Sequence, residues 1–238
     1  MKGLLVRVAA DQSGGGGSWN GPVNSRTGEF VYVAIPESSP THPCMNKPYA
    51  ALHAPLAEHR ILLPEHLATQ DMHLDPDFDQ LTYGDGGERG KQIRAKAGPG
   101  DLLVFYAGLR DVLPADRLVY ALIGLYVVKD VVSAVTIPRA HWPENAHTRR
   151  LLPPRANDIV VRARAGVSGR LERCIQIGDY RRRAYRVWPP LLAVWGGLSV
   201  HDGYLQRSAR LPEFLDAAKF YRWFLSKNVP FIRSNNRL

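Results

Sequence analysis

Residues 98–107 read GPGDLLVFYA and residues 117–128 read RLVYALIGLYVV. The first run opens with a turn of Gly, Pro and Asp and continues as an uninterrupted apolar segment that ends in two aromatic residues. The second run is also apolar and is interrupted by Gly124. Continuous apolar runs that follow turn residues are typical of buried strands. We therefore predict two buried neighbouring strands at the centre of the fold.

Further elements are expected on both sides of this pair. The predicted strands are residues 3–10, 29–35 and 159–164, and the predicted helices are short pieces within 49–70, a short helix at 171–175 and a clear helix at 212–225. The last of these repeats apolar residues at three- and four-residue spacing and is followed by Pro230, a usual stop signal. Residues 14–17, 36–48 and 138–158 are expected to be loops because Gly or Pro and polar residues dominate them. We expect one elaborated α+β domain over residues 1–238.

The chain has a basic balance, with 31 Lys and Arg against 22 Asp and Glu, which gives a formal net charge of +9. Arginine accounts for most of the basic residues, and its planar fork suits phosphate and base edges. A nucleic acid or nucleotide is therefore the expected partner, DNA more readily than RNA, and an ordinary basic surface is the alternative. No apolar run reaches the ~18–20 residues of a membrane span, so we expect a cytoplasmic protein with no membrane partner. The two cysteines have no zinc-type spacing.

The central pair of runs resembles the PUA-like superfamily, whose EVE, ASCH and YTH members share a G-D-x-x-x-F-Y … x-I-G-x-x-x-V pattern. The resemblance covers about 30 residues, at 98–107 and 120–128. It implies a mixed β-barrel core with peripheral helices. It also implies a barrel pocket that receives a single base, often a modified one.

A second set of short polar runs extends the resemblance to another family. These runs are 11–13 (DQS), 19–22 (WNGP), 28–32 (GEFVY), 35–37 (IPE), 73–78 (HLDPDF) and 82–85 (TYGD). Together they are similar to the third of the nucleotide-modification-associated domain families, which are predicted to contain DNA base hypermodification proteins. The similarity runs to about Ser208 and implies a role in phage or bacterial nucleobase modification or its recognition.

Four residues are the candidate catalytic groups: Asp11, His73, Asp75 and Asp77. Asp11 stands where a strand passes into a glycine loop, and a turn-capping role is the alternative. The other three alternate, so their side chains would share one face of an extended segment. A His with two carboxylates suits acid–base work or a metal such as Mn or Fe, but Pro76 makes a plain polar turn an alternative. We assign no metal ligand and leave the cofactor open, because no phosphate loop or dinucleotide fingerprint is present.

Other polar and aromatic residues are candidates for contact with the substrate. They are Gln12, Ser13, Trp19, Asn20, Glu29, Tyr32, Tyr83, Asp85, Arg89, Tyr106, Arg110, Asn145, His147, Arg149 and Arg207. Phosphate contacts are expected from Arg149, Arg150 and residues 181–183, which lie among Tyr180, Tyr185 and Trp188. The alternatives are a surface ion pair for Asp85 and Arg89, a core aromatic role for Tyr106, and an exposed basic hairpin for residues 181–183.

Three functions are compatible with these observations. The protein could recognise a base without changing it, or modify a nucleobase by acid–base or metal-dependent chemistry, or act as a scaffold. The scaffold hypothesis explains neither the excess of arginine nor the polar runs. The enzyme hypothesis predicts that Asp11, His73, Asp75 and Asp77 meet Tyr83 or His147 in one cleft.

Overall fold

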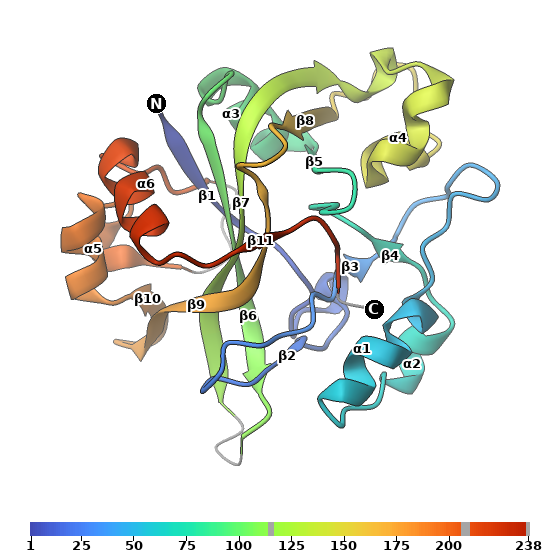
Figure 1. Ribbon diagram of the computed structural model, residues 1–238. Helices are drawn as coiled ribbons and strands as arrows, with labels where there is room; N and C mark the ends of the chain where they lie inside the picture. Colours follow the sequence, from blue (N-terminus) through green and yellow to red (C-terminus); the bar gives the residue numbers. More distant parts are fainter. Residues whose placement is uncertain (114–116, 206–209, 237–238) are drawn as a thin grey trace.

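A mixed sheet forms the centre of the molecule, and helices lie on both sides of it (Figure 1). The computed structural model describes residues 1–113, 117–205 and 210–236. The strands in this part of the chain are β1 (Gly3–Arg7), β2 (Pro22–Val23), β3 (Ile35–Pro36), β4 (Met72–His73), β5 (Thr82–Asp85), β6 (Leu102–Asp111), β7 (Leu118–Ser133), β8 (Ile159–Ala163), β9 (Gly169–Arg181), β10 (Ala184–Val187) and β11 (Phe231–Ile232). The α-helices are α1 (His53–Glu58), α2 (Glu65–Ala68), α3 (Gly87–Lys96), α4 (Ala146–Arg149), α5 (Pro189–Trp195) and α6 (Ala217–Ser226). Short 3₁₀ turns are η1 (Gly14–Gly16), η2 (Tyr49–Leu52), η3 (Ala134–Thr136), η4 (Arg139–Glu144) and η5 (His201–Gly203).

The predicted central pair is present as β6 and β7, which run antiparallel. On its other side β6 pairs in parallel with β1. The long strand β7 pairs with β9 through its first half and with β8 through its second half, and β8 then pairs with β5. Residues from both ends of the chain therefore meet on one sheet.

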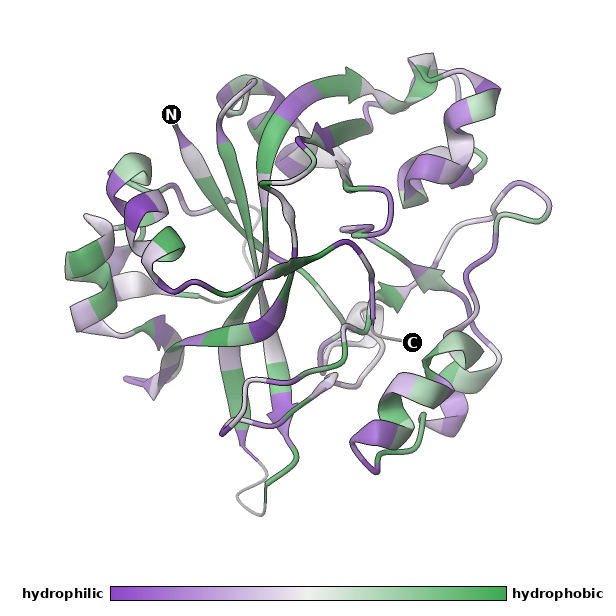
Figure 2. Cartoon of the chain, viewed as in Figure 1, coloured by the Kyte–Doolittle hydropathy of each residue, from purple (hydrophilic) through white to green (hydrophobic). Residues whose placement is uncertain are grey.

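Alternate residues of β6 face two separate apolar layers, as the two-residue period of a strand requires. Val104 packs in the layer that contains Trp195 and Phe220, which come from α5 and α6. Phe105 packs in the opposite layer with residues from the first third of the chain, such as Phe78. Apolar residues accordingly dominate the central strands (Figure 2).

Gly124 interrupts the apolar run of β7 because Phe78 lies against its backbone. A Cβ at this position would be 2.5 Å from the Phe78 ring and 3.0 Å from the Gly169 carbonyl oxygen. Glycine within a strand often marks such a close approach. Its position helps to anchor the segment that continues from His73 to Phe78.

The α+β class is confirmed, but the PUA-like barrel is not. Within the described residues the sheet is open: the path of paired strands from β1 through β6, β7 and β8 to β5 does not close into a barrel. None of the described helices combines the length and the apolar character that crossing a bilayer requires.

Several predicted elements differ from the observed ones. Residues 171–175, expected to be helical, belong to β9, because pairing with β7 overrides their weak local preference. Residues 31–34 are buried as expected but form no strand: Val31 donates to the Pro22 carbonyl and Val33 accepts from Ala10 across irregular segments. The predicted loop at 138–158 contains η4 and α4.

Candidate active site

A cavity of about 100 Å³ lies between the end of β1, the segment after β4, β5, α3 and α4. Its lining residues are Arg7, Val8, Ala9, Asp11, Ile35, His73, Asp75, Tyr83, Gly84, Asp85, Arg89 and His147. They come from segments that are up to 140 positions apart, from Arg7 to His147. Most of the lining is polar or ionisable although much of it is buried.

The ring of His73 is held by the carboxylate of Glu37, on the side of the ring that faces away from Asp75. The pairing of β4 with β3 places His73 opposite Ile35, and Glu37 follows two residues later. His73 Nδ1 lies 2.7 Å from Glu37 Oε2, while Arg150 Nη2 lies 2.7 Å from Glu37 Oε1. Burial lowers the pKa of His73 in spite of Glu37. Burial also opposes ionisation of Glu37, but the hydrogen bonds from His73 and Arg150 outweigh it and lower the pKa of Glu37 to about 2.

Asp75 lies between two imidazoles. Its Oδ1 accepts the Gly84 amide at 2.6 Å and the Asn145 side-chain amide at 3.3 Å. Its Oδ2 is 3.8 Å from His73 Nε2 and 3.4 Å from His147 Nε2. One oxygen of Asp75 is therefore used to fix the carboxylate, and the other faces the two rings.

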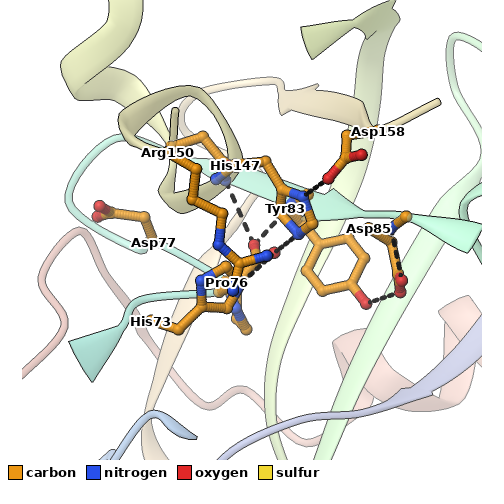
Figure 3. Close-up of polar contacts among 12 residues, drawn as sticks. His73, Pro76, Asp77, Tyr83, Asp85, His147, Arg150 and Asp158 are labelled. Carbon is orange, nitrogen blue, oxygen red and sulfur yellow. Dashed lines mark hydrogen bonds and ion pairs between the residues drawn. The ribbon is translucent and has the colours of Figure 1, made fainter. Parts of the chain in front are cut away.

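His147 enters the site from the short helix α4. Asn145 caps this helix and accepts the His147 amide at 2.9 Å, so the cap also fixes the position of the ring. His147 Nδ1 is hydrogen-bonded to Asp158, which immediately precedes β8 (Figure 3). Burial disfavours the charged imidazole, but the hydrogen bonds to Asp158 and Asp75 outweigh it and raise the pKa of His147 to about 9.

A second polar group closes another wall of the cavity. Tyr83 donates its hydroxyl hydrogen to Asp85 at 2.6 Å, and Arg89 Nη2 donates to the same hydroxyl at 2.9 Å. Arg89 Nε is 3.1 Å from the Asp85 carboxylate. Burial raises the pKa of both Tyr83 and Asp85. The three side chains thus form one connected buried unit.

Asp11 and Arg7 form the remaining polar edge. Asp11 Oδ1 accepts the Ser13 amide at 2.9 Å, and Oδ2 lies 3.1 Å from Arg7 Nη2. A Cβ on Gly16 would overlap the Asp11 carboxylate, so position 16 of the turn η1 requires glycine. Asp11 therefore has the turn-capping contact that the sequence offered as an alternative, and it also faces the cavity.

An aromatic row leads away from Arg7. The Arg7 guanidinium lies 5.6 Å from the centre of the Tyr120 ring, and Tyr120 stacks on Tyr185 at 4.0 Å. Tyr180, which is 61% exposed, meets Tyr185 at 5.2 Å. We call Tyr120, Tyr185 and Tyr180 the aromatic row. It connects the cavity with the β9–β10 hairpin.

The comparisons with known proteins bear on this site. The family model described as nucleotide modification associated domain 3 matches residues 2–215. The chain belongs to this family. The comparisons with curated proteins and with solved structures gave no match. The resemblance to the third nucleotide-modification-associated domain family is thus confirmed, and all the cavity residues of this domain lie within the matched range.

The structure brings together six of the candidate residues of this domain at the cavity. These six are Asp11, His73, Asp75, Tyr83, Asp85 and His147, and Arg89 is a seventh candidate on the same lining. Ser13 and Asn145 do not line the cavity but hydrogen-bond residues that do: Ser13 donates to Asp11 and Asn145 donates to Asp75. The roles proposed for these residues stay predictions.

Other candidates lie away from the cavity. Asp77 is ion-paired with Arg149 in the interior and is directed away from His73 and His147 (Figure 3). The side chains of Tyr32, Tyr106 and Asn20 donate buried hydrogen bonds to main-chain carbonyls. The Asn20 side-chain oxygen also accepts a hydrogen bond from the Gln12 side chain. Trp19 packs against the core, Glu29 and Arg110 line separate hollows, and Arg207 is outside the described residues.

The arginines expected at phosphate groups have mixed surroundings. Arg149 is buried against Asp77, and Arg150 pairs with Glu37, so the structure places both at carboxylates. In the hairpin, Arg181 and Arg182 lie near Asp202, and Arg183 is exposed. The hairpin is the part of this set that solvent reaches most readily.

Sequence reasoning did not select Arg7, Glu37 and Asp158 as site residues. Glu37 and Asp158 act from 36 and 11 positions away from the histidines that they contact. Only pairing of β3 with β4 and of β5 with β8 brings them there. The one local signal for Glu37 and Asp158 is their place next to a strand end, where a carboxylate is a candidate site residue.

Proposed function

We propose that this protein modifies a nucleobase of a nucleic acid, and that the reaction takes place at the cavity between His73, Asp75 and His147. The observation that carries the proposal is the convergence of two imidazoles, Asp75 and the Tyr83–Asp85–Arg89 unit on one small cavity. Membership of the nucleotide modification associated domain 3 family supplies the class of substrate.

The cost of burying these groups supports a chemical role. Ionisable side chains lose hydration free energy in the interior, so a cluster of them that lines a cavity favours a chemical role. Here burial and specific partners shift the pKa of His147 upward and that of His73 downward, although both rings face the same carboxylate. Neighbouring titratable groups whose pKa values are driven apart are a mark of acid–base sites.

The size of the cavity restricts what enters it. A cavity of about 100 Å³ is well below the ~300–1,000 Å³ of sites that enclose a drug-sized ligand. We therefore expect one edge of a base to enter, with the rest of the nucleotide outside. The aromatic row and the exposed Arg183 offer stacking and charge for that outer part.

A larger hollow of about 720 Å³ near Glu29, Phe30 and Arg170 is a less suitable reaction site. The histidine on its lining is His59, whose pKa burial lowers. No second imidazole and no carboxylate–imidazole hydrogen bond is found there within the described residues. It lacks the hydrogen-bonded imidazole–carboxylate pairs that the smaller cavity has.

The test is a nucleoside analysis of DNA from cells that express the protein. We expect a nucleoside of new mass with the wild type, no such nucleoside with Asp75→Asn, and an unchanged amount with Asp79→Asn as the matched carboxylate control. An unchanged nucleoside profile with the wild type would contradict the proposal.

Recognition of a base without chemistry is the second candidate, and the aromatic row favours it. Under this hypothesis the purified protein binds single-stranded DNA with a base preference and leaves every nucleoside unchanged. Binding that is lost in Tyr180→Ala together with an unaltered nucleoside profile would favour recognition over modification.

A further inference from the structure

Three donor atoms face one another in the cavity. They are His73 Nε2, His147 Nε2 and one carboxylate oxygen of Asp75, and they all lie within 4.8 Å of one another. The two shorter separations, from Asp75 Oδ2 to the rings, are 3.4 and 3.8 Å. Ligand atoms ~2.1 Å from one metal ion at tetrahedral angles are ~3.4 Å apart, so small side-chain adjustments suffice.

The outer hydrogen bonds fix which ring nitrogens face inward. Nδ1 of His73 is bonded to Glu37, and Nδ1 of His147 is bonded to Asp158. A carboxylate at Nδ1 keeps a proton there, so Nε2 is the nitrogen that gives up its proton to a metal ion and then directs a lone pair into the cavity. Metal-binding histidines almost always donate their other N–H to such a partner. Both histidines of this site have the arrangement.

Asp75 is prepared in the same way. Its Oδ1 takes two hydrogen bonds, from the Gly84 amide and the Asn145 side chain, and this leaves Oδ2 directed at the rings. When Nε2 of both rings is deprotonated, three electron-pair donors face one another and repel unless a positive charge lies among them. Their surroundings favour such a charge.

The charges around the three donors leave room for a divalent cation. Arg7 with Asp11 and Arg89 with Asp85 form neutral pairs. Glu37, Asp75 and Asp158 contribute three negative charges, and Arg150, which pairs with Glu37, contributes one positive charge. When a metal ion displaces the Nε2 proton of His147 and both imidazoles are neutral, two negative charges remain, which is the charge that one divalent ion balances.

We propose that His73, Asp75 and His147 bind one divalent first-row transition-metal ion. Two imidazoles with one carboxylate suit Fe²⁺, Zn²⁺ or Mn²⁺ better than Mg²⁺ or Ca²⁺, which prefer oxygen ligands. Three protein ligands leave coordination positions open, as catalytic metal sites do. The open side is the cavity, where Arg7, Asp11 and the Tyr83 unit lie. The metal site stands on this geometry and does not depend on the proposed function.

Glu37 and Asp158 are positioning residues in this site, because each holds a ligand ring without facing the ion. Loss of such a partner typically weakens metal binding by ~10–100-fold. Loss of a ligand should weaken it by more than ~100-fold. These two magnitudes separate the ligands from their supports.

The experiment is a metal titration of the full chain after chelator treatment. Co²⁺ is added and the visible absorption of the ion is followed, and Zn²⁺ competition gives the affinity for the second metal. We expect one metal ion per chain. We expect a loss of more than ~100-fold in affinity for His147→Ala and Asp75→Asn, and ~10–100-fold for Asp158→Asn. His141→Ala, at an exposed position shortly before α4, is the matched control and should bind as the wild type does.

Thermal unfolding followed by circular dichroism shows whether each variant is folded. If His147→Ala does not fold, His73→Gln takes its place, and the stoichiometry of the wild type remains decisive on its own. Absence of binding by the wild type, or wild-type affinity in the ligand variants, would overturn the proposal. No nucleic acid enters the assay, so its outcome is independent of whether a nucleobase is modified.

Discussion

Replacement of Gly84 by alanine should displace His147 and lower the stability of the protein. A Cβ at position 84 would lie 2.5 Å from Asn145 Oδ1 and still closer to the ring of His147. Both neighbours are buried, and Asn145 also caps α4 and holds Asp75. The added methyl group therefore strains the cap and the imidazole together.

The magnitude follows from the cost of overpacking. A methyl group forced into a filled interior costs about 1–3 kcal/mol. In a chain of this size each kcal/mol lowers Tm by about 2–4 °C, so we expect a fall of roughly 2–12 °C. Because His147 moves, the affinity for Co²⁺ should fall by at least ~10-fold, the size of effect expected for a misplaced ligand.

The assay combines a thermal melt with the Co²⁺ titration. Gly15→Ala is the matched control, since a Cβ there meets no atom within 4 Å and its φ is not positive. It should leave both Tm and Co²⁺ affinity unchanged. Wild-type Tm and wild-type Co²⁺ affinity in Gly84→Ala would refute the packing of α4 against β5 that we describe.

Three further predictions concern a buried ion pair, a buried cysteine and the β9–β10 hairpin. Arg149→Ala should lower the free energy of unfolding by about 3–5 kcal/mol, because Asp77 is left buried without its partner. Arg94→Ala, at an exposed position, is the control and should have little effect. Equally small effects of the two variants in urea unfolding would argue against the buried pair. Burial raises the pKa of Cys174 to about 12, so roughly one Cys174 side chain in ten thousand is the reactive thiolate at pH 8. Iodoacetamide should therefore label only the exposed Cys44 until urea unfolds the protein. Two adducts on the folded protein would contradict the burial of Cys174. Tyr180→Ala should weaken single-stranded DNA binding by ~1–3 kcal/mol with an unchanged salt slope. Arg183→Ala should instead reduce that salt slope by ~0.7, and Leu62→Ala, at an exposed position, should change neither the affinity nor the slope. A reduced slope in Tyr180→Ala, or an unchanged slope in Arg183→Ala, would disprove this division of roles.

The parts of the fold that the sequence predicts are those with strong local signals. The apolar runs of β6 and β7 and the spacing of α6 are such signals, and the structure has both strands and the helix, although α6 begins at Ala217 rather than at 212. Residues 171–175 lack one, and their conformation depends on pairing with β7. The barrel closure expected from a PUA-like core depends on how distant strands meet, which a 30-residue pattern does not determine.

The candidate site shows the same division between local and distant information. The alternation of His73 and Asp75 is local, and the structure places both at the cavity. Asp77 shares that alternation, yet Pro76 and the pairing with Arg149 direct it elsewhere. Glu37 and Asp158 reach the histidines only because separate strands pair, so the supports of the rings were not visible in the sequence.

The most direct test of the account is to map where a nucleobase lies on the protein. Single-stranded DNA that carries 5-iododeoxyuridine is cross-linked to the wild-type chain by light, and the modified peptides are identified by mass spectrometry. The account predicts cross-links at the cavity and the aromatic row, in peptides that contain Tyr83, His147 or Tyr185. Cross-links confined to other surfaces, such as the hollow near Phe30 and Arg170, would contradict it.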